Sequence, residues 1–336
     1  MTRLGMWLVA GLMTLCGCRD AATQQRGDAP VRLGFFPNLT HAAALVGLQH
    51  GELERGLMPV KIDPRPFNAG PAAMEALFAG ALDACYVGPA PAINSYLRSR
   101  GEKLVIVAGA AENGAGLVVR KSAGITSARD LHGKKLATPQ LGNTQDVALR
   151  RYLADAGLET NERGGDVQVL PLANADILTL MKRRQLDGAW VPEPWMTRLL
   201  HEADGTLLVD ERTRWPQHRF PTTVLVLSRA FIEERPELAH KLVAAHVATV
   251  RWIRGHRDEA RALVDSGLEK WARKRLPPAV LAEAWEHVDI SERLDETALH
   301  EQLEDARALG FLPAEGDASG LVDRRFLDET TGPPRP

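Results

Sequence analysis

The chain has 336 residues, of which 45% are hydrophobic and 25% charged, and its formal net charge at pH 7 is -2. This length and composition are sufficient for two domains with cores of their own, and they exclude an intrinsically disordered chain. The near-zero net charge lacks the electrostatic footprint of nucleic-acid binding, so no nucleic-acid partner is expected.

The N-terminal residues have the pattern of a targeting signal. One basic residue precedes an apolar run at residues 4–15, which is too short to span a bilayer and is typical of a signal-peptide core. The run ends in LCGC at residues 15–18, which resembles the bacterial lipobox, whose last cysteine is lipidated. The alternative is an ordinary secretory signal with two incidental cysteines. We predict a signal peptide over residues 1–17, lipidation of Cys18 and a polar tether over residues 18–30.

From residue 31 onward, short apolar runs alternate with segments of helical pattern. The expected strands are 31–36, 60–67, 83–88, 103–111, 134–140, 167–173, 186–192, 206–211 and 220–231. The expected helices are 41–57 (weakened by Gly51), 71–82, 90–100, 125–133, 144–158, 175–185, 236–256 and 277–288. Continuous apolar strands separated by helices predict an α/β fold with a parallel-type sheet covered on both faces.

A weak internal repeat suggests two similar halves. LDACYVGPAPAI at residues 82–93 and LDGAWVPEPWM at residues 186–196 share leucine-aspartate, two small residues, an aromatic residue and valine. A proline-rich turn follows each copy, and a helix-like segment precedes it. The repeat is short enough to arise by chance, but two lobes with equivalent strand-to-turn edges explain it better.

Four turns follow predicted strands: FPNLTHA (36–42), VGPAPA (87–92), PQLGNTQD (139–146) and WVPEPW (190–195). In open α/β sheets, ligands bind outside the carboxyl ends of the strands. None of these turns contains lysine or arginine. A helix N-terminus offers unpaired N–H groups and the positive end of the helix dipole, so it can hold an anion without a basic side chain.

The turn at residues 139–146 is the first candidate. Asn143, Thr144 and Gln145 would add side-chain donors at the start of a helix. The alternative is that Asn143 or Thr144 only caps that helix, with Asp146 favouring its first turn. Four such turns in one chain favour the anion-binding hypothesis.

The turn at residues 190–195 is the second candidate. Prolines on both sides of Glu193 would fix its backbone, and Trp190 and Trp195 could wall a pocket for an organic group or a cation. The alternative is that both tryptophans are core residues and Glu193 caps the helix that follows.

The first turn offers Asn38 and His41, although His41 could equally be an ordinary residue of a helix start. Enzyme signatures such as G-x-S-x-G, the phosphate-binding loop, H-E-x-x-H and C-x-x-C are missing from the expected folded part. Three histidines in the segment 236–256, His240, His246 and His256, are not spaced as metal ligands and are predicted to be solvated. Cys85, in an apolar run, is predicted to be a buried packing residue.

Taken together, several motifs resemble a known family. They are LCGC, FPNLTHAAALVGL, FNAGPAAMEALFAGALDACYVGPAPAI, LATPQLGNTQDVALR, WVPEPW and FPTTVLV. They are similar to the solute-binding proteins of ABC importers, most of all to the aliphatic sulfonate, nitrate and taurine group, which is related to binding proteins for thiamine precursors. The resemblance runs in order from the signal to about Phe231; the C-terminal helices are family-like only in general character.

The resemblance implies an α/β, two-lobed periplasmic binding protein of type II-like fold. Each lobe would have a mixed sheet flanked by helices, with extra helices at the C-terminus. Lobe one would comprise residues 31–116 and 222–330, and lobe two residues 117–221, with the two crossings acting as a hinge.

The resemblance also implies a ligand site between the lobes. Carried over motif by motif, its residues are Asn38, His41, Gly88, Pro89, Asn113, Gly114, Asn143, Thr144, Gln145, Trp190, Glu193, Thr222 and Thr223. A carboxylate at Glu193 would repel a bare sulfonate. Glu193 would therefore suit a ligand that also carries an amine or another donor, or it would point away from the ligand.

The implied function is that of a non-enzymatic, lipid-anchored monomer on the periplasmic or cell-surface side of the membrane. It would bind a small anionic organic solute without cofactor or metal and deliver it to an ABC permease in the inner membrane. The alternatives are a binding protein for nitrate or a thiamine-precursor pyrimidine, and an enzyme on the same fold. For an enzyme, only His41 could supply a reactive group in the cleft.

Overall fold

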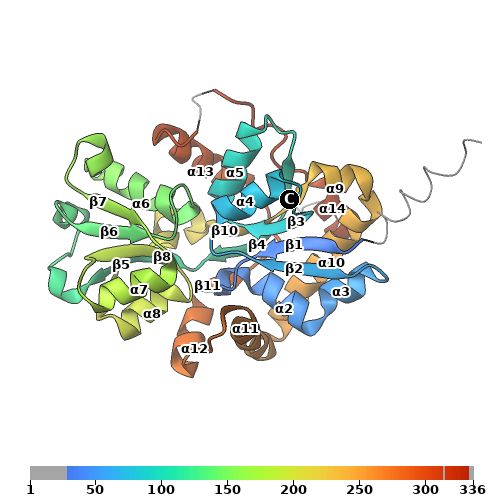
Figure 1. Cartoon of the computed structure of the whole chain (residues 1–336), viewed down its shortest axis with the longest axis horizontal. Helices are drawn as coiled ribbons and strands as arrows, with labels where there is room; N and C mark the ends of the chain where they lie inside the picture. The colour runs from blue at the N-terminus through green and yellow to red at the C-terminus, as the bar shows by residue number, and fades with distance from the viewer. Residues whose placement is uncertain (1–28, 313–314, 333–336) are drawn as a thin grey trace, which may run out of the picture.

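The computed structural model describes residues 29–312 and 315–332 of the chain. This part is built on two β-sheets, which lie to the right and left in Figure 1 with helices packed around each. We call the first sheet with its helices lobe one and the second sheet with its helices lobe two. The predicted signal peptide, Cys18 and most of the predicted tether lie outside the described residues.

Lobe one has a mixed sheet with the strand order β11-β4-β10-β3-β1-β2. Its strands are β1 (Val31–Phe35), β2 (Ile62–Pro66), β3 (Ala84–Val87), β4 (Leu104–Asn113), β10 (Pro221–Ser228) and β11 (Val288–Ile290). β1 is parallel to β2 and β3, whereas β10 runs antiparallel to β3 and β4. β11 pairs antiparallel with β4.

Lobe two repeats this plan in the order β7-β6-β8-β5-β9. Its strands are β5 (Ala115–Arg120), β6 (Lys135–Thr138), β7 (Gln168–Pro171), β8 (Gly188–Pro192) and β9 (Gly205–Asp210). β6 is parallel to β7 and β8, and β5 runs antiparallel to β8 and β9. The expected fold class, two mixed sheets flanked by helices, is confirmed. Two of the antiparallel strands, β5 and β10, are those on which the chain enters lobe two and returns to lobe one.

The helices cover the sheets. Around the first sheet lie α2 (Ala42–His50), α3 (Glu52–Leu57), α4 (Gly70–Phe78), α5 (Pro89–Arg98), α9 (Arg229–Glu234), α10 (Pro236–Gly255), α11 (Arg257–Ala272), α12 (Pro278–Glu286), α13 (Glu296–Ala308) and α14 (Arg325–Thr331). Around the second lie α6 (Thr144–Asp155), α7 (Asn174–Lys182) and α8 (Trp195–Glu202). In the part of the chain that the structure covers, no helix is both long and apolar enough to cross a membrane.

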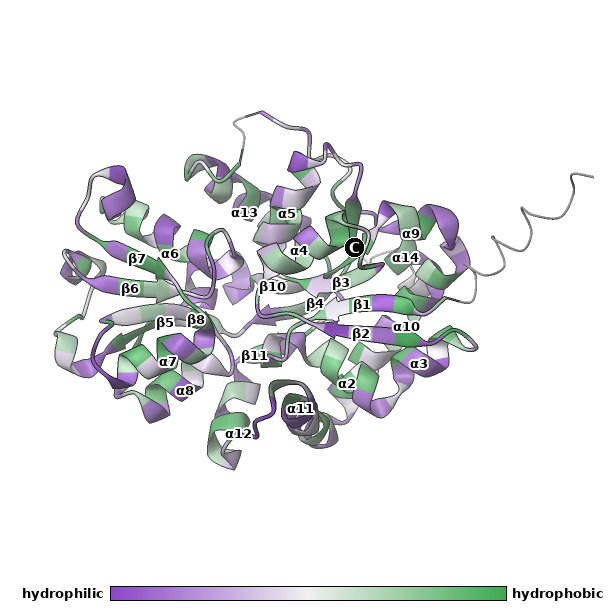
Figure 2. Cartoon of the chain, in the orientation of Figure 1, coloured by the Kyte–Doolittle hydropathy of each residue, from purple (hydrophilic) through white to green (hydrophobic). Residues whose placement is uncertain are grey.

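Side-chain alternation places the second sheet between two cores. On β5, Leu117 and Val119 pack into a cluster with residues of α6, whereas Val118 packs into a cluster with residues of α7 and α8. This is the period of two that a strand buried on both faces requires. The helices α7 and α8 carry alternating apolar and polar bands along their length (Figure 2). A helix shows such bands when one of its faces packs on a sheet and the opposite face meets solvent.

One predicted helix is divided in the structure. The segment 41–57 forms α2 and α3, which meet at Gly51 in the left-handed conformation, with φ of 79°. Glycine takes this conformation at little cost, so it ends one helix and starts the next.

The chain passes between the sheets twice. The first passage is at Gly114, between β4 and β5, and the second runs through residues 211–220, between β9 and β10. Ala115 and Gly116 therefore belong to the second sheet and Pro221 to the first, each on the other side of the predicted lobe boundaries.

The C-terminal part of the chain touches both lobes. β11 completes the first sheet, and α12 packs against α8 of lobe two. His201 of α8 lies 2.6 Å from Glu283 of α12. α13 contacts both α5 and α6, and Arg151 of α6 pairs with Asp305 of α13 at 3.4 Å. These helices thus join the lobes by side-chain contacts, in addition to the two passages of the chain.

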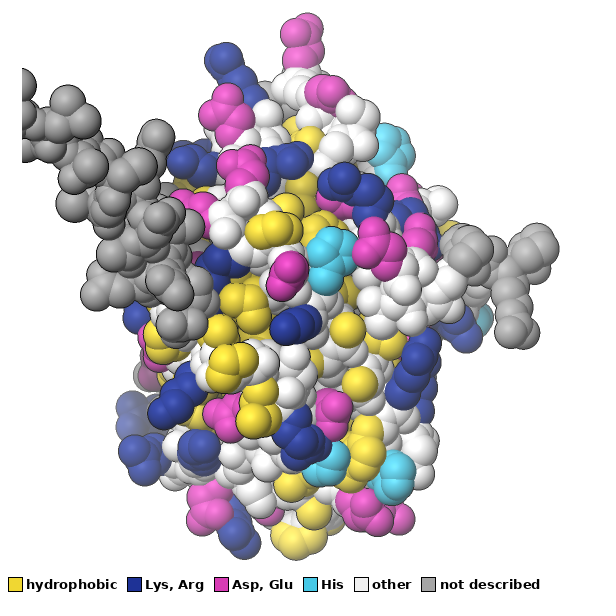
Figure 3. Space-filling view, turned by 90° about the vertical axis from the view of Figure 1, so that its right-hand side faces the viewer, with side chains coloured by type: hydrophobic (Ala, Val, Ile, Leu, Met, Phe, Trp, Pro, Cys, Tyr) yellow, Lys and Arg dark blue, Asp and Glu magenta, His cyan; other side chains and the backbone are white. Residues whose placement is uncertain are grey.

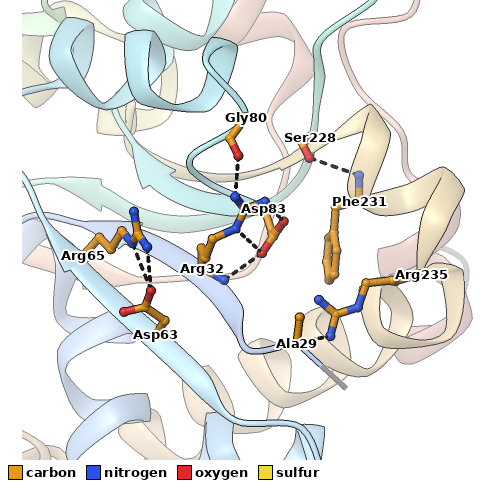
Figure 4. A network of polar contacts seen from close by, with 9 residues as sticks. All are labelled: Ala29, Arg32, Asp63, Arg65, Gly80, Asp83, Ser228, Phe231 and Arg235. Atoms are coloured by element: carbon orange, nitrogen blue, oxygen red, sulfur yellow. Dashed lines mark hydrogen bonds and ion pairs between the residues drawn. The ribbon is translucent and has the colours of Figure 1, made fainter. Parts of the chain in front are cut away.

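Ion pairs gather at the amino ends of the parallel strands. In lobe one, the Asp83 carboxylate accepts hydrogen bonds from the Arg32 backbone N–H at 2.8 Å and from its guanidinium at 2.6 Å, and the guanidinium also donates to the Gly80 carbonyl (Figure 4). In lobe two, Asp187 accepts from the Lys135 backbone N–H at 2.9 Å and from Arg120 at 2.7 Å.

The end of lobe one that faces away from lobe two carries acidic and basic side chains interspersed (Figure 3).

The prediction that His246 is solvated is wrong. Its side chain is fully buried on α10, because α10 packs into the core of lobe one. The Tyr86 hydroxyl donates to Nδ1 at 3.0 Å, and Nε2 donates to the Gly109 carbonyl at 2.8 Å. Burial lowers the pKa of His246 to about 4. Cys85 is buried as predicted, and burial raises the pKa of its thiol.

Candidate ligand-binding site

The turns after the parallel strands meet at a small cavity between the lobes, which we call the cleft cavity. Its volume is about 30 Å³, enough for a compact polar group. It is lined by Phe36, Asn38, Thr40, His41, Asn68, Ala69, Gly70, Gly88, Pro91, Pro139, Asn143, Thr144, Gln145, Asn174, Pro192 and Thr222. Residues at or just after the ends of β1, β2 and β3 in lobe one, and of β6, β7 and β8 in lobe two, contribute. This is where the topology of an α/β sheet leads a ligand to bind.

Lobe two supplies the N-terminus of α6. Asn143 is its N-cap, and its side-chain oxygen accepts from the Asp146 N–H at 2.8 Å. The N–H groups of Thr144 and Gln145, in the first turn, have no acceptor within the helix. The Thr144 hydroxyl is buried and has no hydrogen-bond partner among the described residues. The end of α6 therefore presents backbone and side-chain donors to the cavity.

Asp146 supports this turn from behind. Its fully buried carboxylate accepts from the Thr138 hydroxyl at 2.9 Å and the Gly142 N–H at 2.9 Å, and it contacts Arg150 at 3.2 Å. These contacts hold the acidic group within the turn, and neither Asp146 nor Arg150 lines the cavity. None of the described residues that line the cavity carries a charged side chain, so the positive potential there comes from the helix dipole and aligned N–H groups.

Lobe one supplies the opposite wall. His41 accepts a hydrogen bond at Nδ1 from the Phe36 N–H at 3.3 Å, so its proton resides on Nε2. Burial lowers the pKa of His41 to about 3, and the ring is therefore neutral. Asn38 accepts at Oδ1 from the Trp195 indole N–H at 3.1 Å, a contact that joins the lobes across the cleft and leaves the Asn38 amide N–H groups as donors.

Gly88 lies close to Thr144 of lobe two on this wall. A Cβ added there would lie 2.4 Å from Thr144 Oγ1. The backbone of Gly88, with φ of -66° and ψ of 150°, is accessible to any residue, so the glycine is required by space and not by conformation. Thr222 completes the wall, and its hydroxyl donates to the Asn113 carbonyl.

The structure therefore brings together part of the predicted set: Asn38, His41, Gly88, Asn143, Thr144, Gln145 and Thr222 line the cleft cavity. Pro89, Asn113, Gly114, Trp190, Glu193 and Thr223 do not. Pro89 is the first residue of α5, and Thr223 is fully buried on β10. Asn113 and Gly114 form the first passage between the lobes, where the Asn113 amide donates to Asp289 at 2.8 Å and the Gly114 carbonyl accepts from the Glu193 N–H at 2.8 Å.

Trp190 and Glu193 have structural contacts away from the cavity. Trp190 is fully buried in the core of lobe two, and its indole N–H donates to Glu211 at 2.8 Å. The Glu193 carboxylate accepts from the backbone N–H and hydroxyl of Thr197 at 3.1 and 2.7 Å, and it pairs with His287 of lobe one at 2.6 Å. Of the alternatives weighed for this turn, Trp190 in the core and Glu193 at the start of α8 match these contacts.

Several lining residues were not predicted, notably Thr40, Asn68 and Asn174. Asn68 follows β2, and Asn174 begins α7 after β7. Both occupy the same strand-to-helix position as the residues that were predicted. Applying the strand-end rule to every parallel strand, and not only to the turns of unusual composition, would have found them.

Comparison with known proteins assigns the chain to a family. The sequence profile of the NMT1-like family matches residues 24–266. The chain belongs to the NMT1-like family. A Brucella abortus protein provisionally named a binding protein is 28% identical over 227 residues, and the match spans 65% of each chain. The chain thus matches slightly less than two thirds of that relative's length. An aliphatic sulfonates-binding protein of Bacillus subtilis, provisionally so named, is 24% identical over 77% of this chain and 74% of its own.

Solved structures show that this NMT1-like chain has the fold of periplasmic binding proteins. The alkanesulfonate-binding protein of Xanthomonas axonopodis pv. citri, bound to MOPS, has a TM-score of 0.74 at 21% identity, covering 88% of this chain and 98% of its own. The nitrate-binding protein of Synechocystis PCC 6803 also has a TM-score of 0.74, at 15% identity, covering 90% and 88%.

Proposed function

We propose that this protein is the solute-binding component of an ABC importer. It captures a small anionic organic solute, of the aliphatic sulfonate or taurine type, between its lobes and delivers it to a permease in the inner membrane. The observation that carries the proposal is the buried Thr144 hydroxyl, which has no partner among the described residues and lies beside the open N–H groups of α6. The described residues that line the cavity around it are neutral. A buried donor without a partner is costly unless a ligand supplies the acceptor.

The contacts of Glu193 remove the main objection to a simple sulfonate. Its carboxylate is occupied by Thr197 and His287 and does not line the cavity. A sulfonate head in the cavity therefore meets donors and no carboxylate. Binding closes the cleft by a hinge motion, because a ligand buried between two lobes stabilises the closed arrangement.

An enzymatic function has less support. The candidate base, His41, has a pKa of about 3, far below the value near neutrality that general acid–base catalysis favours. The relatives named above are binding proteins by name. Turnover of a sulfonate by the purified protein would reverse this conclusion.

The substrate class is tested by a thermal-shift screen of sulfonates, aminosulfonates, phosphonates, nitrate and thiamine precursors. A ligand at a hundred times its Kd adds about 2.7 kcal/mol of stability. Sulfonates or related amino-anions are expected to raise the melting temperature. A shift with nitrate alone, or with a pyrimidine alone, would show that the proposed substrate class is wrong.

Thr144→Ala tests the site itself. The variant removes one donor to the anion, which is worth about 1.5–3 kcal/mol, so affinity for the best sulfonate should fall roughly ten- to hundredfold in calorimetry. The cap belongs to Asn143, so Asn143→Ala is the control: it should lower the melting temperature of the empty protein, at a cost of about 1 kcal/mol, whereas Thr144→Ala should not. Wild-type affinity in a folded Thr144→Ala protein would rule out the donor role.

We further propose that the mature protein is a monomer held at the membrane by a lipid on Cys18. The support is the LCGC run after the apolar segment. In a bacterial host, Cys18→Ala should move the protein from the membrane fraction to the soluble fraction. Unchanged membrane association would contradict the anchor.

A further inference from the structure

A larger hollow opens beside the cleft cavity, and we call it the side groove. Its volume is about 700 Å³, and it runs between the lobes, with α7 and α8 on one side and α11 on the other (Figure 1). Four residues line both the side groove and the cleft cavity: Phe36, Asn38, Asn68 and Asn174. Exposed residues such as Lys182 also line the groove, which therefore connects the molecular surface with the cavity.

One face of α7 forms a wall of the groove along the length of the helix. Ala175, Leu178, Thr179 and Lys182 line it, with the spacing of three and four residues that places side chains on the same helical face. At a rise of about 1.5 Å per residue, Lys182 lies about 12 Å along the helix from Asn174. Because Asn174 also lines the cleft cavity, Lys182 marks the end of this wall that lies away from the ligand site.

The charged side chains that line the groove, among the described residues, are all basic. They are Lys182, Arg198 and Lys274. Glu202 of α8 pairs with Lys182 at 2.8 Å and with Arg198 at 2.7 Å, so one carboxylate offsets two cations. The groove therefore keeps a net positive charge, whereas the whole chain has a formal net charge of -2.

Further basic residues flank the groove on both lobes. Arg183 and Arg184 follow Lys182 at the end of α7, and Arg273 precedes Lys274 at the end of α11. These two pairs of residues are exposed, and within the described part of the chain none of their four side chains makes an ion pair. Each lobe thus contributes two uncompensated positive charges beside the groove.

Nearby carboxylates offset little of this charge. Glu269 of α11 is engaged by Arg275 at 2.7 Å, and Asp176, in the first turn of α7, does not line the groove. Exposed charges act over about one Debye length, which is about 30 Å at an ionic strength of 0.01 M and about 8 Å at 0.15 M. At low salt, the field of the basic residues therefore extends well beyond the groove.

We propose that the basic residues of the side groove guide anionic solutes electrostatically from the surface to the cleft cavity. A cleft lined by one sign of charge concentrates ions of the opposite sign and raises their association rate. The described lining of the cleft cavity carries no charged side chain, so the guiding residues do not hold the solute at the end of its path. This inference rests on the proposed function and specifies how the solute reaches the site. It predicts an effect on the rate of capture.

Stopped-flow tryptophan fluorescence with two ligands of similar size tests the guidance at pH 7. Trp195 is a suitable reporter, because its indole N–H donates to Asn38 of the cleft cavity. 1-Propanesulfonate is an anion, whereas taurine is a zwitterion without net charge. Between about 10 and 150 mM sodium chloride, the association rate constant of 1-propanesulfonate should fall about threefold, and that of taurine should stay nearly constant. Equal salt dependence for the two ligands would overturn the inference.

Charge reversal on each lobe locates the guiding residues. In the double variant Arg183→Glu with Lys274→Glu, the association rate constant of 1-propanesulfonate at low salt should fall at least about threefold and lose its salt dependence, while the dissociation rate constant stays within about twofold. The matched control, Arg129→Glu with Lys241→Glu, reverses one exposed base on each lobe outside the groove and changes the net charge equally. It should associate at the wild-type rate.

A charge-preserving variant separates guidance from a structural role. Arg183→Lys with Lys274→Arg should keep the wild-type rate and salt dependence, and the melting temperatures of the empty variants check that each is folded. Equal losses in the reversal and in its control would mean that only net charge matters. A change confined to dissociation would mean that these side chains contact the bound solute. Either result overturns the inference.

The proposed substrate class and the guidance can fail separately. If the thermal-shift screen retains only nitrate, the sulfonate class is wrong, and nitrate replaces 1-propanesulfonate as the anion in the same rate measurements. A salt-independent nitrate association rate would then overturn the guidance as well. If no anion binds the wild type, the proposed function fails and this inference falls with it.

Discussion

The two copies of the internal repeat, residues 82–93 and 186–196, occupy equivalent places in the two lobes. Asp83 and Asp187 each accept a hydrogen bond from the first residues of a neighbouring parallel strand and pair with an arginine. The aromatic residues three positions on, Tyr86 and Trp190, are both fully buried. The shared part of the repeat is thus scaffolding, which fixes the start and the core face of a strand.

The copies differ beyond the strand. Gly88 and Pro192 both line the cleft cavity, but the next residues, Pro89 and Glu193, do different things. Pro89 starts α5, whereas Glu193 holds the start of α8 and reaches His287 in the other lobe. The unusual composition of WVPEPW therefore reflects a contact between the lobes, made by Glu193 and His287. In the turn at residues 87–92, Gly88 instead leaves room beside Thr144 at the cleft cavity.

The largest difference between the copies should appear in stability. Glu193→Ala leaves His287 and the Thr197 N–H without their buried acceptor, and removal of one partner of a buried pair costs about 3 kcal/mol. Pro89→Ala, at the equivalent position, should cost less than about 1 kcal/mol because α5 keeps its first turn. Urea unfolding measures both values. Similar losses for the two variants would show that the turns are equivalent after all.

For ligand affinity, the larger effect is expected in the first copy of the repeat. Gly88→Ala places a methyl group 2.4 Å from Thr144 Oγ1, so either the lobes separate or Thr144 turns away from the ligand. Affinity for the best sulfonate should fall at least tenfold, about 1.4 kcal/mol, with little change in unfolding free energy. Gly255→Ala is the control, because a Cβ there meets nothing within 4 Å. Full affinity in the Gly88→Ala protein would show that the cleft does not need this contact.

The buried partners of the two aromatic residues sharpen the comparison through the pH dependence of stability. Burial lowers the pKa of His246, beside Tyr86, from 6.5 to about 4, so the unfolded chain binds the extra proton and stability falls as pH falls through that window. Burial raises the pKa of Glu211, beside Trp190, from 4.5 to about 8, so the folded protein holds the extra proton and stability falls as pH rises through that window.

Each group contributes a slope of at most about 1.4 kcal/mol per pH unit. In urea unfolding at a series of pH values, His246→Gln should flatten the acid side and Glu211→Gln the side toward pH 8. The same pH dependence in wild type and variants would mean that neither group is neutral when the protein is folded.

The sequence was sufficient for the fold class because most strands of both lobes contain short apolar runs and the helices between them are marked by glycine and proline. It did not predict β5, on which the chain enters lobe two, or the short strand β11. It was less sufficient for the site. Turn composition identified Asn143, Thr144 and Gln145, but it also drew attention to Trp190 and Glu193, whose partners Glu211 and His287 lie in distant segments. No local pattern encodes such contacts. Asn174 was missed because a single asparagine at a helix start looks like ordinary capping.

The contacts of α12 and α13 with lobe two have a consequence for binding strength. The pairs His201–Glu283, Glu193–His287 and Arg151–Asp305 join the lobes without any ligand. We expect these contacts to raise the fraction of empty molecules that already hold the binding-competent shape. The apparent Kd equals the intrinsic Kd divided by that fraction, so residues that do not themselves line the cleft cavity set how much of the intrinsic affinity is realised. The C-terminal helices thus tune the solute concentration at which the protein fills, although they contribute no residue to the cleft cavity.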